Sequence, residues 1–313
     1  MTARHYFYLA LGALAIAALP AGAQNRDRDR DRDYGSEQLT SKVDTTVSLS
    51  KGGTVDLSLV SGEIIVTTGS GSQVKIHATS ERGVLMFSAT PTRVSLNVRS
   101  QHGRMGDTRY EVSVPVGTRL ALKAVSGDIS SRGVNGEIEA GTVSGDLEVS
   151  DAKGDISLEA VSGDVTAEHL NGDVRVSAVS GDVSLTDVIG PLEVETVSGE
   201  MRLDGVKSKS VRTETVSGEL DYDGSLDADG RYEFHSHSGD LRLRVPSNAG
   251  ATVRVETFSG SVESDFPMTM QPGDHGMNGR PKRLEFTFNG GGARLTAETF
   301  SGDITIEKTS SRP

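Results

Sequence analysis

The sequence predicts an all-β protein: a right-handed parallel β-helix or solenoid with coils of about 18–21 residues and a less regular, β-rich N-terminal portion. Glycine recurs every nine residues from Gly127 to Gly199, and the third position counted from each glycine is always apolar. A second period of 18 residues, marked by Val-Ser-Gly followed by Asp or Glu, lies over the first. One nine-residue unit cannot bury its own apolar face, whereas stacked copies can, which is how a solenoid is stabilised.

Residues 1–23 have the features of a signal peptide. Arg4 gives a positive start, residues 6–19 form a mostly apolar run, and Ala21-Gly22-Ala23 is a small-residue cleavage site. A retained membrane anchor is the alternative, although the run is short for a bilayer and charged residues follow it almost at once. We therefore expect export to the periplasm, cell surface or extracellular space, with no transmembrane segment in the mature chain.

The composition limits the fold and the partners. Glycine is abundant, at 37 of 313 residues, while aromatic residues make up only 4% and tryptophan is absent, which favours many turns around a thin aliphatic core. The chain has no cysteine, so we expect neither a disulfide nor a lipid anchor on a processed N-terminus. A net charge of −12 argues against nucleic acid and anionic lipid as partners.

Residues 24–39 are predicted to be a disordered linker, because the Arg-Asp alternation from Arg26 to Asp33 has nothing apolar to bury. Residues 40–122 are predicted to form the irregular β N-terminal part of the solenoid domain. Alternating apolar and polar residues indicate half-buried strands, in the stretches TTVSLS, TVDLSLV, EIIVTT, QVKIHATS, RVSLNVRS and YEVSVPV.

Residues 123–308 are predicted to be the repeat β-solenoid, with residues 309–313 as a tail. Each 18-residue coil consists of two non-identical halves, and we expect the apolar residue at position eight of every half to be core, Val161 among them. Later coils lengthen to 19 and 21 residues, and residues 268–283 loop out. We expect Phe300–Lys308 to form the final coil and the strands before Val125 to cover the other end.

The Gly-Asp pair of each repeat has a predicted structural role. Glycine takes a tight corner that other residues would adopt only under strain. The acid that follows it faces outward, where its carboxylate can accept hydrogen bonds from backbone N–H groups.

The arrangement of strands and turns in the repeats resembles that of a known family. The stretches YEVSVPVGTRLALKAVSGDIS, SGDLRLRVPSNAGATVRVETFSGSVESDFP and TAETFSGDITIEK each combine alternating strands with a Ser-Gly turn. Over about residues 45–308 this is similar to the bacterial putative-adhesin family, exported β-solenoid domains of unknown function. The resemblance implies a β-helix and an envelope location, and it supplies no catalytic residue.

One set of side chains is the main candidate site. An acidic ladder is expected to stack at about 4.8 Å along the coils, formed by Asp128, Asp146, Asp164, Asp182, Glu200 and Glu219. We interpret this ladder as structural and solvated, and specific calcium binding is the alternative. Calcium-binding nonapeptide solenoids have Gly-Gly-x-Gly-x-Asp units, and this chain departs from them because only one glycine precedes each acid.

Other chemistry is weakly indicated. His235 and His237 share a strand face and could bind zinc only if His275 folded back, so a semi-buried packing role is expected for His237. The Asn289–Gly292 stretch reads as a turn, without the strand–helix context of a phosphate loop.

We expect no enzyme activity, no cofactor, and neither a catalytic nor a metal-binding residue. The expected function is that of an adhesin or cell-envelope scaffold, a monomer that contacts a large surface partner, either an envelope protein or a glycan. A calcium-stabilised or polysaccharide-processing β-helix is the alternative. Scattered basic residues and the absence of tryptophan, the usual sugar-stacking residue, argue against polysaccharide processing.

Overall fold

The computed structural model describes residues 38–100, 106–267 and 282–309. The predicted signal peptide at 1–23, most of the 24–39 linker and the loop that contains His275 lie outside these residues. Residues 38 and 39, predicted to be linker, belong to strand β1, whose backbone pairs with that of Leu85–Phe87. Thr309, assigned to the tail, is the last residue of a strand and pairs with Pro246.

The described residues form one continuous hydrogen-bonded sheet of 25 strands. The N-terminal strands are β1 (Gln38–Thr40), β2 (Lys42–Ser48), β3 (Thr54–Thr68), β4 (Gln73–Ser80), β5 (Gly83–Ala89), β6 (Arg93–Ser100), β7 (Thr108–Val114) and β8 (Arg119–Arg132). The repeat strands are β9 (Ile138–Ser144), β10 (Leu147–Ser150), β11 (Ile156–Ser162), β12 (Val165–Asn171), β13 (Val174–Ser180), β14 (Val183–Ile189), β15 (Leu192–Ser198) and β16 (Met201–Val206). The C-terminal strands are β17 (Ser210–Ser217), β18 (Leu220–Gly224), β19 (Arg231–Ser238), β20 (Leu241–Pro246), β21 (Ala251–Ser259), β22 (Val262–Ser264), β23 (Lys282–Phe288), β24 (Ala293–Ser301) and β25 (Ile304–Thr309).

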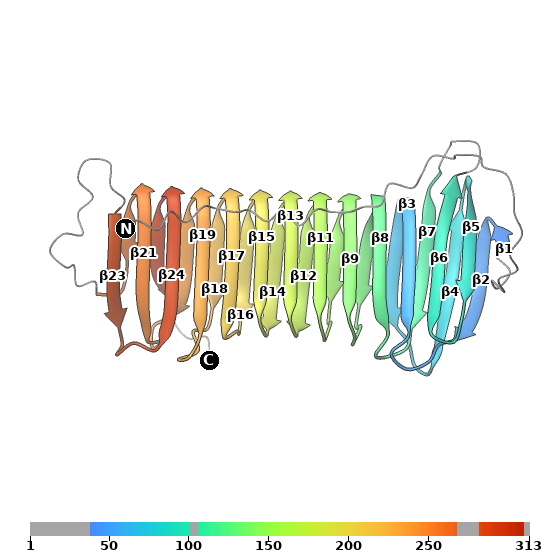
Figure 1. Ribbon diagram of the computed structural model, residues 1–313, viewed down its shortest axis with the longest axis horizontal. Coiled ribbons are helices and arrows are strands. Elements are labelled where there is room, and N and C mark those ends of the chain that lie inside the picture. The colour runs from blue at the N-terminus through green and yellow to red at the C-terminus, as the bar shows by residue number, and fades with distance from the viewer. Residues whose placement is uncertain (1–37, 101–105, 268–281, 310–313) are drawn as a thin grey trace, which may run out of the picture. The chain divides into compact units, whose positions relative to one another are not determined.

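Each repeat coil contributes one strand to each of two faces of a β-solenoid. The first face contains β9, β11, β13, β15, β17 and β19, and the second contains β10, β12, β14, β16, β18 and β20 (Figure 1). Neighbouring strands on a face run parallel, and Ile156 pairs with Ile138 on one side and Val174 on the other. The 18-residue sequence period is therefore one turn of the solenoid.

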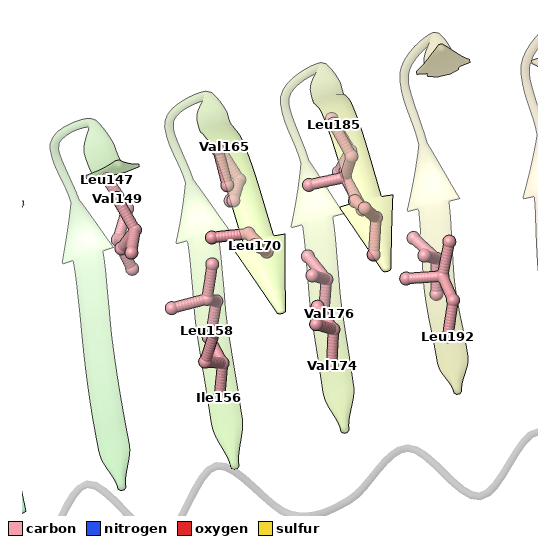
Figure 2. Close-up of a cluster of buried hydrophobic side chains, with 14 of the residues drawn as sticks. Leu147, Val149, Ile156, Leu158, Val165, Leu170, Val174, Val176, Leu185 and Leu192 are labelled. Atoms are coloured by element: carbon pink, nitrogen blue, oxygen red, sulfur yellow. The ribbon is translucent and has the colours of Figure 1, made fainter. Parts of the chain in front are cut away.

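The core lies between the two faces and is mostly aliphatic. Positions three and five of each half-coil point inward from both faces, so equivalent side chains of successive coils stack on one another (Figure 2). Ile156 and Leu158 on the first face approach Val165 and Leu170 on the second, and all four are almost fully buried. Burial of such side chains is worth about 1.5–3 kcal/mol each, which is how a chain without disulfides is stabilised.

Position eight is core in only half of the copies, so part of the sequence prediction is wrong. On the second face it is buried, as at Ala152 and Leu170, but on the first face Val161 and its equivalents are only half-buried. The second-face strands contain a left-handed residue at position seven, such as His169 with φ 54°, which reverses the alternation that follows. First-face strands alternate without interruption, so Ala160 points inward and Val161 outward.

The N-terminal part contains a regular coil that the sequence period does not reveal. Strand β3 is long enough to run through both faces, and Ser61, Gly62 and Glu63 pair with Ser126, Gly127 and Asp128 of β8. On its other side β3 pairs in parallel with β6 and β7. Strands β4 and β5 then add antiparallel to that outer coil, and β2 and β1 pair antiparallel with them. These strands cover the N-terminal end of the stack.

The C-terminal coils are not stacked in sequence order. Strand β24 pairs in parallel with β19 on one side and β21 on the other (Figure 1). Strand β25 pairs in parallel with β20 and β22. The prediction that Phe300–Lys308 forms the final coil is therefore wrong, because this coil is inserted between two earlier ones. The outermost coil is β21 with β22, and β23 pairs antiparallel with β21 beyond it.

The Asn289–Gly292 turn allows this insertion. All four residues have positive φ, from 47° at Asn289 to 128° at Gly292, and the turn joins β23 on the outer side of β21 to β24 on its inner side. The Asn289 side-chain amide donates to the carbonyl oxygens of Ser247 and Ala249 at 2.9 and 2.7 Å. The sequence interpretation of this stretch as a turn is confirmed, and its role is to carry the chain across the end of β21.

Substitutions at position eight should have different effects on the two faces, because the residue is buried on the second face and half-buried on the first. Leu170→Ala removes buried core volume and should lower the free energy of unfolding by about 2–5 kcal/mol. Val161→Ser, at the outward equivalent on the first face, should change it by less than about 0.5 kcal/mol. Urea unfolding of both variants checks this, and equal destabilisation by the two would contradict the assignment of faces.

Candidate binding surface

Glycine is required at the corner where each coil passes from the first face to the second. Gly145, Gly163 and Gly181 have φ of 144°, 142° and 133°, a region that residues with a side chain rarely adopt. A Cβ on Gly163 would lie 2.0 Å from the carbonyl oxygen of Gly145, and one on Gly181 would lie 2.1 Å from that of Gly163. Successive coils therefore touch backbone to backbone at this corner, which we call the glycine corner.

The predicted acidic ladder follows the glycine corner and forms a hydrogen-bonded column. Oδ1 of Asp128 accepts from the backbone N–H of Asp146 at 3.0 Å, and Oδ1 of Asp146 accepts from that of Asp164 at 2.9 Å. The series continues from Asp164 to Asp182 and from Asp182 to Glu200, at 2.9 and 2.8 Å. Each aspartate thus caps a backbone N–H of the next coil, and these charge-assisted bonds oppose the repulsion between stacked carboxylates.

The column extends further than the sequence repeat indicates. Glu63 of β3 lies in register with Asp128 at its start, and Asp240 and Asp303 continue it beyond the six predicted residues. Oδ1 of Asp240 accepts from the backbone N–H of Asp303 at 2.8 Å, and Oδ1 of Asp303 accepts from that of Ser261 at 2.7 Å. Each belongs to a Ser-Gly-acid motif, so a search for that motif independent of spacing would have found all three.

The longer acids at the middle of the column have arginine partners. Oε1 of Glu219 lies 2.9 Å from Nη1 of Arg242, and Glu200 pairs with Arg202 of the adjoining strand. Within the residues that the structure describes, no three His, Asp or Glu side chains are arranged to hold a metal ion. The geometry of the column is that of backbone capping, with one aspartate oxygen committed to each bond.

Ionisable side chains on the outer surface are paired between coils. On the first face Glu193 lies between two arginines, 3.7 Å from Nε of Arg175 and 3.7 Å from Nε of Arg212, and Arg212 also reaches Glu233 at 3.5 Å. Such exposed pairs contribute little individually. Glu195 lies beside this set, and its partial burial together with Glu214 raises the pKa of its carboxyl.

His169 and His235 are also paired with acids. Nδ1 of His169 lies 3.3 Å from Oδ1 of Asp151, and its Nε2 lies 3.7 Å from Oδ2 of Asp187, all three being exposed second-face residues. Nδ1 of His235 lies 3.5 Å from Oε2 of Glu298. These are contacts along columns of neighbouring coils, and none of them closes around a pocket.

A line of outward apolar side chains runs beside the glycine corner, at the residue that precedes each Ser-Gly pair. Because the coils are in register, the equivalent residues lie next to one another. The set begins at Val60 of β3. We call its part from β8 to β21 the apolar line, which consists of Val125, Val143, Val161, Val179, Val197, Val216, His237, Phe300 and Phe258, in spatial order.

Aromatic rings form the C-terminal part of the apolar line. The Phe300 ring stacks on Phe258, with centroids 4.9 Å apart and planes inclined by 3°, and on His237, with centroids 5.2 Å apart. Phe300 and Phe258 are 49% and 44% exposed, and His237 is exposed as well. The semi-buried packing role predicted for His237 is therefore wrong. The uninterrupted alternation of first-face strands points this position outward, so its ring lies on the surface.

Two hollows on the surface are shallow. One of about 420 Å³ is lined by loop residues that include Leu226, Asn248 and Asn289. The other, of about 440 Å³, lies over the outer side of the N-terminal strands and is lined in part by His77 and Glu111. His77 contacts Asp44 at 3.4 Å, and Asp44 lines the same hollow.

The fold and the glycine corner define a β-solenoid protein built from Ser-Gly-acid repeats. The family profile of Toastrack DUF4097 matches residues 36–187 and again residues 107–307. The chain belongs to the Toastrack DUF4097 family, and its resemblance to the putative-adhesin family is confirmed.

The solved structures that match this chain share little sequence with it. A putative lipid binding protein from Parabacteroides distasonis ATCC 8503 is 12% identical with a TM-score of 0.49, over 86% of this chain and 97% of that one. A putative adhesin from the same organism is 9% identical with a TM-score of 0.45, over 88% and 98%. A putative adhesin from Bacteroides fragilis NCTC 9343 is 10% identical with a TM-score of 0.41, over 87% and 98%.

No curated protein matches this chain. In the part of the chain that the structure describes, no helix has the length and apolar character needed to cross a membrane.

Substitution of a corner glycine tests the backbone contact. Gly163→Ala places a methyl group against the Gly145 carbonyl and should destabilise the protein by more than about 2 kcal/mol. Gly133→Ala is the control, since Gly133 also has a positive φ of 74° but its nearest neighbours to a new Cβ are 3.8 Å away. It should cost only the conformational strain of about 1–2 kcal/mol. Urea unfolding measures the stability of both variants. A smaller loss of stability for Gly163→Ala than for Gly133→Ala would refute the backbone contact.

Calcium titration tests the acidic column. A ligand that binds only the folded state raises its stability by about 2.7 kcal/mol at a hundredfold excess over Kd, so millimolar calcium would raise the Tm by several degrees if Kd were micromolar. We expect a small shift that magnesium reproduces, because the aspartate oxygens already accept backbone N–H groups. A large calcium-selective shift, abolished by replacing Asp146, Asp164 and Asp182 with Asn, would establish a calcium site instead.

Proposed function

We propose that this protein is a non-enzymatic binding protein or scaffold of the cell envelope, adhesin-like in its mode of action, that contacts a large partner through its outer surface. The observation that carries the proposal is the apolar line with its exposed aromatic rings, because it continues over neighbouring coils and offers area in place of a pocket. A repetitive surface of this kind binds a large partner through many weak contacts.

The arrangement of ionisable groups supports a binding role. Catalysis by acids, bases or nucleophiles requires two or three groups held around one substrate position. In the described residues, pairs such as His169 with Asp187 and Arg212 with Glu233 join neighbouring coils along an exposed surface. The two hollows are open and shallow, which gives a small substrate little to enclose it.

Export is part of the proposal and is supported by the sequence of residues 1–23. A charged residue, an apolar run and a small-residue cleavage site in this order direct a chain to the secretory pathway. The absence of cysteine suits a protein whose stability does not depend on the redox state of its compartment. The envelope also supplies large protein and glycan surfaces, which are the partners that an extended contact area requires.

Binding and hydrolysis measured on the same preparation test the proposal. The exported form should bind one or more immobilised envelope proteins or glycans saturably, while heat-unfolded protein serves as the control. Incubation with envelope polysaccharides should release no reducing ends. Cleavage of a glycan by the intact protein would overturn the proposal, as would failure to bind any envelope component.

A further inference from the structure

We infer that the apolar line is the docking surface for a cationic amphipathic α-helix of a partner protein. The inference rests on the proposed function and narrows its partner from envelope components in general to a protein segment of defined chemistry. It depends on three features of the surface: the exposed apolar side chains, the carboxylates on both sides of them, and the spacing of the coils.

The apolar side chains are exposed together. Single exposed hydrophobic residues are common on proteins, whereas a continuous row marks an interaction surface. Phe258 and Phe300 are about half exposed and Val125 is 36% exposed, and the line joins them through residues on every intervening coil. The ring faces of Phe300 are occupied by Phe258 and His237, so a partner meets the outward edges of the stack.

Carboxylates border the line on the side of the glycine corner. This border is the acidic column, three residues after each apolar residue, and its aspartates are held in position by the backbone hydrogen bonds described above. Beside successive residues of the line, from Val125 onward, lie Asp128, Asp146, Asp164, Asp182, Glu200, Glu219, Asp240 and Asp303. The position beside Phe258, at the end of the line, is Ser261. Arg202 and Arg242 are the basic residues paired with this border.

Carboxylates also predominate on the other side, two residues before each apolar residue. That border consists of Lys123, Gly141, Glu159, Ser177, Glu195, Glu214, His235, Glu298 and Glu256. Arg212 pairs with Glu214, and Arg283 with Glu256. Glu195 and Glu214 lie in register on adjacent strands, and the raised pKa of Glu195 reflects its burial and this repulsion. A cation placed beside them would relieve it.

The spacing of the coils is closer to the pitch of a helix than to the side-chain spacing of an extended strand. Strands in register place one residue of the line about every 4.8 Å. A helix laid along the line presents an apolar residue about every turn of 5.4 Å, through positions i, i+3, i+4 and i+7. An extended strand places side chains of one face about 6.6–6.8 Å apart and loses register sooner. A helix with lysine or arginine on both margins of its apolar stripe therefore meets the line and both borders together.

The same charges disfavour the other occupants of an apolar surface. A second copy of this chain would bring a net charge of −12 against carboxylate borders of the same sign. An anionic membrane surface would be repelled in the same way. A basic helix is attracted to both borders, which gives fast association that weakens as salt is added.

The test uses a synthetic peptide and the full exported chain. The probe is a fluorescent 20-residue amphipathic helix with leucine along one face and lysine on its margins, and the control peptide has glutamate in place of each lysine. Fluorescence anisotropy should show saturable binding of the lysine peptide that weakens with salt. The glutamate peptide should not bind.

Matched variants locate the site. Phe258→Ser combined with Phe300→Ser should weaken binding of the lysine peptide by about tenfold or more, as removal of central aromatic residues does at interfaces. Glu195→Gln combined with Glu214→Gln should weaken it and reduce its salt dependence. Ile189→Ser is the control, because Ile189 is 47% exposed but lies at the opposite corner, and binding should be unchanged. Thermal melting verifies that each variant is folded.

Five outcomes would overturn the inference. The first three are no binding of the lysine peptide, equal binding by all variants, and binding of the glutamate peptide with similar affinity. The other two are self-association that depends on Phe258 and Phe300, and adsorption to anionic phosphatidylglycerol vesicles that depends on the same residues. The envelope-binding assay separates the two proposals. If the doubly substituted Phe variant still binds its envelope target as wild type does, the inference fails while the proposed function stands. If wild type binds neither peptide nor envelope component, both fail.

Discussion

The contact between corner glycines is the constraint on which the rest of the structure depends. Parallel strands in register stack at about 4.8 Å, and at a sharp corner this spacing leaves no room for a side chain that points along the stack. The carbonyl oxygen of Gly145 occupies the position where Gly163 would place its Cβ, and Gly163 stands in the same relation to Gly181. Glycine therefore recurs once per coil at this corner, and that requirement produces the period seen in the sequence.

A fixed period predicts the solenoid but not every side chain in it. The inward positions three and five follow from alternation alone, and the structure confirms them. The burial at position eight depends on a left-handed residue one step earlier, and Asp151, His169 and Asp187 adopt that conformation without being glycine. Asp and His are polar residues that tolerate it, but nothing in the sequence distinguishes them from ordinary exposed residues. The acidic column was predictable because it follows the corner glycine.

The order of coils in space was the other feature that sequence could not supply. At each end of the repeat array the next coil comes from elsewhere in the chain: β3 lies beside β8, and β24 lies beside β19. The sequence period gives the order of the repeats along the chain, whereas the order of the coils in space depends on hydrogen bonds between distant segments. The insertion of β24 also means that β19 and β21 are joined only through a strand from the end of the described chain. Such non-local closure is slow, because loop entropy is lost before the pairing is gained.

At the corner, the residue that determines the fold and the residue that determines the surface chemistry lie two positions apart in the sequence, as Gly163 and Val161 do. The glycine cannot change without disturbing the next coil, and the following aspartate is fixed by the N–H that it caps. The residue before the Ser-Gly pair points outward and contributes little to the core, so it is free to be Val161 in one coil and Phe300 in another. Variable outward side chains on an invariant backbone are suited to recognition, because substitutions that change binding specificity there have little effect on the stability of the fold. We therefore propose that the apolar line is the part of this solenoid where side chains set binding properties, because these side chains contribute little to stability.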